Sequence, residues 1–163
     1  MLADLAETIK NYLVGLPSEK WGLIKPNTVI GDTVDFPIVN TLDPDEVIKC
    51  KTRKIFIMPI VPKYDLSVIT GNRGGQPIRH FSKSLVISSI IVTPFTEIAE
   101  GDVSSWAEIK KILNLREELE RHIITTNFGY RLTNAEAEEP LDLKLNERVF
   151  MCVTDYQYDT IRC

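Results

Sequence analysis

The sequence predicts an α+β fold in which helices pack on one face of a mainly antiparallel β-sheet. Three patterns carry this prediction: a helical repeat of apolar residues over the first 13 positions, two long β-like runs in the middle, and a second helical repeat followed by an apolar strand. Helices and paired strands are segregated along the chain, which is typical of α+β domains. With 163 residues, the chain is long enough to bury a proper core, and we expect one domain, 1–163.

The composition is ordinary for a globular chain, with 44% hydrophobic and 26% charged residues. The formal net charge of −4 argues against a protein whose main task is to grip nucleic acid. The first residues, MLADLAETIKNYL, have no basic region leading into an apolar core, and no apolar run reaches the roughly 20 residues that span a bilayer. We therefore expect folding in a cytoplasm and no membrane partner.

The three cysteines, Cys50, Cys152 and Cys163, have no short spacing. They predict neither a disulfide framework nor a zinc site, and we expect no metal and no cofactor. Cys152 lies in an apolar run and is expected to be a small buried hydrophobe.

The first element is expected to be an amphipathic helix, which Gly15 and Pro17 end. Its apolar stripe consists of Leu2, Leu5, Ala6, Ile9 and Leu13.

The segment 18–52 is broken by several prolines and a glycine, and we expect it to be an extended arm. Short β-like pieces occur at Thr28–Ile30 and Ile38–Thr41, and the sequence LDPDEV at Leu42–Val47 predicts a turn.

Two strands are predicted in the middle of the chain. The run Arg53–Val61 is rich in β-branched and aromatic residues, and Pro59 within it is expected at a sheet edge or a bulge. The run Ser82–Phe95 is apolar on both faces, which predicts a central strand covered on each side. Between them, 62–81 is expected to be a mobile, glycine-rich hairpin loop.

A long helix follows, beginning at a capping box formed by Ser105 and Glu108 and ended by Gly129. We expect it to be capped and to pack on the same face of the sheet as the first helix. Its buried stripe is expected to consist of Ile109, Ile112, Leu115, Leu119, His122 and Ile123.

The segment 134–147 is polar and acidic and is expected to be extended. The run Arg148–Tyr158 predicts the last strand. One face of that strand is expected to carry Phe150, Cys152, Thr154, Tyr156 and Tyr158.

The stretch TGNRGGQPIRH, residues 70–80, is the strongest candidate for a functional loop. It is not a phosphate-binding P-loop, because no lysine and hydroxyl residue follow the last glycine at the required spacing. Its Gly-Gly-Gln tripeptide is also found at the catalytic tip of peptide-chain release factors, but Pro77 follows here and no basic tail accompanies it. We interpret it as an interaction loop, consisting of Lys63, Arg73, Gly74, Gly75, Gln76, Arg79 and His80.

Other catalytic patterns are not found in the sequence. The two histidines, His80 and His122, form no metal-binding or nucleophilic motif, and the acidic run after residue 135 is more typical of a solvated segment than of a cation site. We therefore expect no enzymatic activity. A small enzyme, a translation-related Gly-Gly-Gln protein and a regulatory binding domain remain as alternatives.

Long segments without a compact fold often serve docking, and long apolar strands require cover from elsewhere. The order of elements from Lys54 to Tyr158, with a polar arginine-containing loop, a capped helix and the terminal strand LNERVFMCVTDYQY, resembles the tail terminator (tail-completion) proteins of long-tailed bacteriophages. The likeness lies in the architecture and not in a diagnostic motif.

The resemblance implies a homohexameric ring that caps the tail tube and provides the docking surface for the head. Its partners would be other copies of itself, the tail tube protein and the head–tail connector or neck proteins, with DNA passing through the lumen without specific binding. The protein would be assembled in the host cytoplasm and located in the virion, in the tail and neck. Arg73, Arg79 and Lys63 would then make salt-sensitive contacts. The alternative within this class is a head-completion or neck adaptor protein on the portal side.

Overall fold

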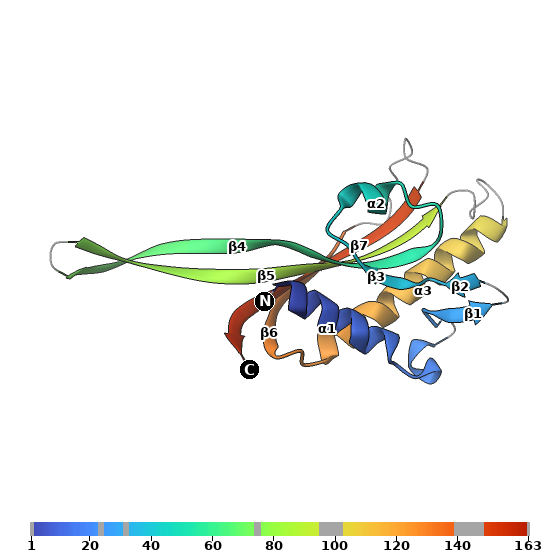
Figure 1. Cartoon of the computed structure of the whole chain (residues 1–163), viewed down its shortest axis with the longest axis horizontal. Coiled ribbons are helices and arrows are strands. Elements are labelled where there is room, and N and C mark those ends of the chain that lie inside the picture. The colour runs from blue at the N-terminus through green and yellow to red at the C-terminus, as the bar shows by residue number, and fades with distance from the viewer. Residues whose placement is uncertain are drawn as a thin grey trace.

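The computed structural model describes residues 2–22, 25–30, 33–73, 76–94, 103–138 and 149–162. Figure 1 shows a body of helices and strands from which two strands extend as a long ribbon. In chain order the elements are α1 (Leu2–Val14), the 3-10 helix η1 (Ser18–Trp21), β1 (Thr28–Ile30), β2 (Thr33–Asp35), β3 (Ile38–Asn40), α2 (Pro44–Ile48), β4 (Lys54–Arg73), β5 (Gln76–Pro94), α3 (Val103–Thr125), β6 (Tyr130–Ala137) and β7 (Val149–Arg162).

The main sheet has five strands in the order β3-β4-β5-β7-β6. Every neighbouring pair in it is antiparallel except β3 and β4, which run parallel over three residues each. A separate two-stranded sheet is formed by β1 and β2. The prediction of an α+β fold with a mainly antiparallel sheet is confirmed. The central place of β5, between β4 and β7, is confirmed as well.

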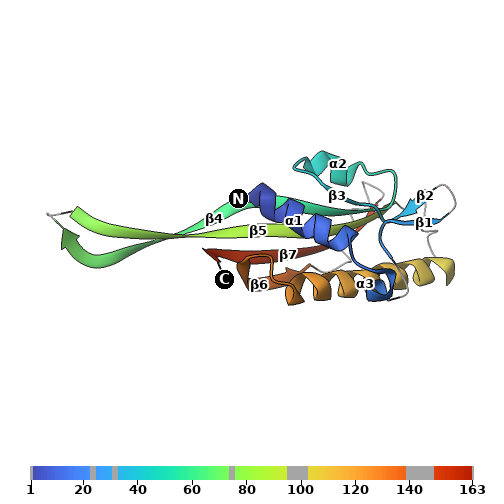
Figure 2. The same cartoon turned by 60° about the horizontal axis from the view of Figure 1, so that its bottom comes forward.

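The helices α1 and α3 cover one face of the main sheet, as predicted. The buried stripe of α1 lies over β3, β4 and β5, and α3 lies over β7. Figure 2 shows both helices running along the body, with β5 and β7 visible between them. The core between them and the sheet consists mainly of Leu5, Ile9, Leu13, Ile55, Ile57, Leu85, Ile87, Ile112, Leu115, Leu119, Cys152, Tyr156 and Tyr158.

The opposite face of the sheet has a smaller core, over which α2 packs. Val47 and Cys50 contact a cluster formed by Phe56, Ile90 and Val92. The prediction of a turn at Leu42–Val47 was wrong, because Asp43 and Pro44 begin a short helix there. The Asp43 carboxylate accepts a hydrogen bond from the Asp45 N–H at 2.9 Å, and Pro44 occupies a first-turn position where no donor is needed.

The segment 18–52 is not one extended arm. It contains η1, the β1–β2 hairpin, the edge strand β3 and α2. The β-like pieces at Thr28–Ile30 and at Ile38 onward are confirmed as β1 and β3. Trp21 and Phe36 are fully buried in the larger core, and these two large side chains hold the segment against the body.

The prediction that 62–81 is a loop was wrong, because this segment is β-strand wherever the structure describes it. Both sides of it continue the strands, so that β4 runs to Arg73 and β5 begins at Gln76. The residues YDLSVIT (64–70) carry β-branched and aromatic types that favour a strand, and this preference outweighs the prolines and glycines nearby. Gly74 and Gly75, which separate the paired residues Arg73 and Gln76, lie outside the described residues.

The long helix starts earlier than predicted. It begins at Val103, so Ser105 lies inside its first turn and is not its N-cap. Its buried stripe is confirmed at Ile112, Leu115, Leu119, His122 and Ile123, and Ile109 is half-buried. The last strand and its buried face are also confirmed in β7.

The expected extended conformation of 134–147 is found at Asn134–Ala137, which belong to β6, whereas residues 139–147 lie outside the described residues. That β6 begins at Tyr130 and pairs with β7 was not predicted, because its polar and acidic residues hide this pairing. Within the described part of the chain, no helix is both long and apolar enough to cross a membrane.

Candidate interaction surface

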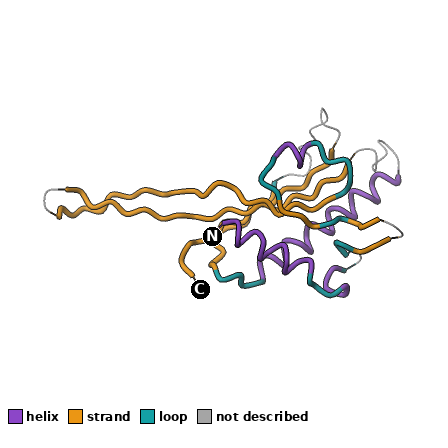
Figure 3. The backbone as a smooth tube through the Cα atoms, in the orientation of Figure 1, coloured by secondary structure: helices purple, strands orange, loops and turns teal. Residues whose placement is uncertain are grey.

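The most prominent feature of the molecule is the distal half of the β4–β5 hairpin, which we call the ribbon and define as residues 63–83. The strand β7 pairs with β5 only from Ser84 to Pro94, and β3 pairs with β4 only from Ile55 to Ile57. Beyond these points the two strands pair with each other alone, down to the pair Arg73 and Gln76. Figures 1 and 3 show the ribbon extending well past the helices.

The residues predicted as an interaction loop are spread along this ribbon. Lys63 lies at its base opposite Ser84, and Arg73 and Gln76 lie opposite each other beside the turn. His80 and Arg79 lie between them, paired with Ser67 and Val68. The structure therefore brings Arg73, Gln76 and Arg79 to the distal end and leaves Lys63 far from them. Gly74 and Gly75 are outside the described residues.

Next to the end of β3, the edge of β4 that β3 leaves unpaired is blocked by two residues, Pro59 and Asn40. The Ile55 N–H donates to the Pro37 carbonyl at 2.9 Å, so every second residue of β4 directs its backbone groups toward this edge. Pro59 is therefore one of the edge-facing residues and has no N–H to offer, as predicted for a proline at an edge. The Asn40 side chain donates to the outward carbonyl of Ile57 at 3.0 Å. Together these residues block strand addition at the base of the ribbon.

The opposite edge of the sheet, along β6, has no such protection among the described residues. Its regular pairing with β7 runs from Asn134 to Ala137, and the Glu138 N–H extends it by donating to the Val153 carbonyl at 2.9 Å. All five residues from Asn134 to Glu138 are exposed. Ala135 and Ala137 are small, so they leave the outer backbone groups accessible.

The β6 edge carries like charges that no described cation neutralises. Glu136 lies directly opposite Asp155 of β7, and Glu138 is two residues further along the same strand. Asp155 accepts a hydrogen bond from the Ser88 hydroxyl, whereas the described part of the structure shows no ion pair at any of these three carboxylates. Like charges directly opposite each other destabilise a sheet. This edge is therefore suited to a basic partner.

Sequence reasoning missed the β6 edge and Asn40. The acidic run was recognised, but an alternation of small and acidic residues gives no hydrophobic period from which a strand could be inferred. Asn40 follows an apolar pair in β3 and is polar where the sheet ends, which was its only signal.

Two hollows border the β3 side of the sheet. One of about 380 Å³ lies between the start of α1 and the end of β3, against Ala3, Leu42 and Pro59. The other, of about 600 Å³, lies between α2 and β4 and is lined by both lysines and carboxylates, so that charges of both signs surround it. Both are wide open.

Two buried polar side chains away from the sheet edges, His122 and Cys152, have structural surroundings that explain them. The His122 imidazole lies with Nε2 2.7 Å from the Lys20 carbonyl and edge-on to Trp21, so it joins η1 to α3. Burial raises the pKa of the Cys152 thiol to about 11, although the Arg116 guanidinium beside it acts in the opposite direction. Among the described residues no group of three or more His, Cys, Asp or Glu side chains is arranged to hold a metal ion.

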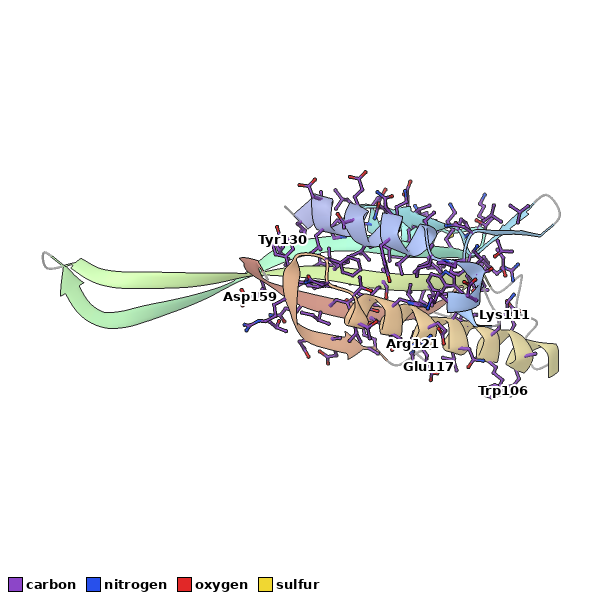
Figure 4. All side chains as sticks on the ribbon, turned by 90° about the horizontal axis from the view of Figure 1, so that it is seen from below. Trp106, Lys111, Glu117, Arg121, Tyr130 and Asp159 are labelled. Atoms are coloured by element: carbon purple, nitrogen blue, oxygen red, sulfur yellow. The ribbon has the colours of Figure 1, made fainter. Side chains whose placement is uncertain are left out.

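The outer side of α3 offers a further exposed surface. Figure 4 shows Trp106, Glu117 and Arg121 on the side of the helix turned away from the sheet. Trp106 is 62% exposed, which is unusual for so large an apolar side chain.

No protein-family model matches this sequence, and a search of curated proteins finds no relative. The function is therefore inferred from the geometry of the ribbon and of the sheet edges.

Proposed function

We propose that this protein is a structural subunit of a phage neck, which forms a ring that terminates the tail tube and provides the docking surface for the head. The observation that carries the proposal is the ribbon, a pair of strands with no partner in the rest of the described chain beyond Lys63 and Ser84. An enzyme or a simple binding domain has no evident need for such an element.

The ribbon makes sense as a contact to another protein. A two-stranded hairpin by itself is marginally stable in water, because it cannot bury a hydrophobic face. Residues that order on contact with a partner gain the burial that the isolated ribbon lacks. The ribbon of a ring subunit would find this partner in a neighbouring subunit, in the tail tube or in the connector.

The two ends of the sheet also fit a ring. The ribbon and the β6 edge are different surfaces of the same chain, and a contact between different surfaces is heterologous. Such contacts continue from subunit to subunit and produce a closed ring when the rotation between neighbours closes. Six copies would satisfy the homohexamer that the resemblance implies, with DNA passing through the centre without specific binding.

The proposal is tested by measuring the native mass of the purified 18.5 kDa chain with light scattering, alone and with tail tubes. We expect a ring of about six chains, either free or formed on the tube ends, and tubes that stop growing when it is added. A chain that stays monomeric with tail tubes present contradicts the proposal. A ring that binds portal complexes but not tubes supports the adaptor alternative instead.

The alternative of a translation-related Gly-Gly-Gln protein has a separate test. We expect the purified chain to show no peptidyl ester hydrolysis, because a structural contact does not require a reactive amide at Gln76. A peptidyl ester hydrolysis activity that disappears in Gln76→Ala would instead support a Gly-Gly-Gln protein.

A further inference from the structure

We infer that the open edge of β6 is the docking site for the ribbon of a second copy of this chain, which adds to the sheet as a further strand. The inference rests on the proposed ring and names the contact that closes it. It also predicts which of the free strand edges the neighbour uses.

The first step is the choice of edge. On the β3 side, Pro59 removes a donor and Asn40 occupies the outward carbonyl of Ile57, so an incoming strand finds no continuous row of backbone groups. On the β6 side, the residues from Asn134 to Glu138 are exposed and regularly paired on their inner side only, within the described chain. An added strand gains main-chain hydrogen bonds there.

The second step is the exclusion of a symmetric contact. Two β6 edges facing each other would bring Glu136 and Glu138 of one copy against the same carboxylates of the other. Asp155, opposite Glu136, adds a third carboxylate on each side. Like charges directly opposite each other are destabilising, so pairing between the β6 edges of two copies is unfavourable.

The third step is charge complementarity with the ribbon. Residues 71–80 contain Arg73 and Arg79 and no acidic residue. The segment 134–142 contains four acidic residues and no basic one. Such pairing of opposite charges steers association and fixes register.

The length and direction of the ribbon decide between a contact within one chain and a contact between two copies. From Lys63 to Arg73 the ribbon extends about 30 Å at the usual rise of a β-strand. Figures 1 and 2 show it directed away from the body, with β6 back beside the helices. The distal arginines are therefore remote from the β6 edge of their own chain, and the contact must be made with another copy.

A charge-swap experiment tests this contact in the full chain. We expect the Arg73→Glu/Arg79→Glu variant and the Glu136→Lys/Glu138→Lys variant to assemble more weakly. In each, the protein concentration at which half of the assembly has dissociated should rise at least about tenfold, and combining the four changes in one chain should restore the original concentration. The matched control for the Glu136→Lys/Glu138→Lys variant is Glu7→Lys/Glu117→Lys, which makes the same change of net charge as that edge variant, at exposed residues of α1 and α3, and should assemble normally. Normal assembly of both ribbon and edge variants overturns the inference.

Cross-linking identifies the contact directly. In a Cys163→Ser background, chains with Asn72→Cys are mixed with chains carrying Ala137→Cys; Cys50 and Cys152 are buried and should not react. We expect a disulfide-linked dimer only in the mixture. A ring of normal mass without this link places the ribbon elsewhere and overturns the inference, while the ring itself survives. A link among Ala137→Cys chains alone shows β6–β6 pairing and also overturns it. A monomer in all conditions contradicts the proposed function as well.

Discussion

Tyr156 and Tyr158 lie on the same buried face of β7, but their hydroxyl groups differ. The Tyr156 hydroxyl shares a hydrogen bond with the Ser89 hydroxyl at 3.1 Å, whereas the Tyr158 hydroxyl is buried and has no hydrogen-bond partner among the described residues. An unpaired buried hydroxyl costs free energy, since it has lost its bonds to water. The two residues therefore form a matched pair for measuring what a buried hydroxyl contributes.

We expect Tyr158→Phe to leave the free energy of unfolding unchanged or to raise it by up to about 1 kcal/mol, because it removes an unpaired polar group. Tyr156→Phe should lower it by about 1–2 kcal/mol, because the Ser89 hydroxyl loses its partner in the core. Urea denaturation of the two variants measures both values. Equal losses in the two variants would mean that the Tyr158 hydroxyl has a partner after all.

The same groups predict the alkaline limit of stability. Burial raises the pKa of Tyr156, Tyr158 and Cys152 above the ordinary values of 10.0 for tyrosine and 9.0 for cysteine. The folded state then holds these protons more tightly than the unfolded state, so their contribution is complete below about pH 9 and is lost as the pH rises. Denaturation between about pH 8 and pH 11 should show a falling free energy of unfolding, with a shallower fall in Tyr158→Phe. A flat profile contradicts this assignment.

The sequence predicts the position of a residue where the spacing of apolar residues determines which side chains are buried. Cys152 and the stripe from Ile112 to Ile123 were placed correctly, because spacing alone decides which side faces the sheet. Asn40 could not be assigned a role, since its function depends on β3 ending opposite Ile57. That end is a tertiary feature with no local signal.

At the scale of elements, a group of charges attaches the β1–β2 hairpin to α3 and β4. The Asp35 carboxylate is buried and lies 3.1 Å from both the Arg53 guanidinium and the Lys111 ammonium. Arg53 also pairs with Glu108 at 3.1 Å, and both cations lie over the Phe36 ring. The network therefore joins the end of β2, the start of β4 and α3, which are distant in sequence.

We expect Asp35→Ala to lower the free energy of unfolding by about 3 kcal/mol, because it leaves two cations facing each other at a partly buried site. The control is Arg121→Ala, which removes a pair with Glu118 on a side chain that is 61% exposed and should cost less than about 1 kcal/mol. Chemical denaturation compares them. A loss in Asp35→Ala no greater than in the control would show that the network contributes little.

The elements also differ in how far the sequence predicts them. The interiors of α1, α3 and β7 follow from their apolar periods, and their bounds are nearly as expected. The prolines and glycines of 62–81 predict a loop, whereas the β-branched residues of 64–70 favour the strand that the structure shows. The polar strand β6 pairs because β7 offers it an edge, so its pairing cannot be inferred from the sequence of β6 alone.

At the scale of the whole molecule, stability and assembly are assigned to different parts. The body contains both cores, and the described ribbon makes no pairing to it beyond Lys63 and Ser84. The ribbon should therefore be dispensable for folding and essential for the ring.

A variant with a shortened ribbon tests whether the ribbon is dispensable for folding and essential for the ring. Replacing residues 64–83 by an Asn-Gly turn keeps the pair Lys63 and Ser84 and closes it with a two-residue hairpin connection. Sedimentation and urea denaturation of this variant should show a monomer whose free energy of unfolding lies within about 1 kcal/mol of that of the isolated full-length subunit. A shortened chain that still forms rings, or one that loses as much stability as a core substitution, would contradict the account.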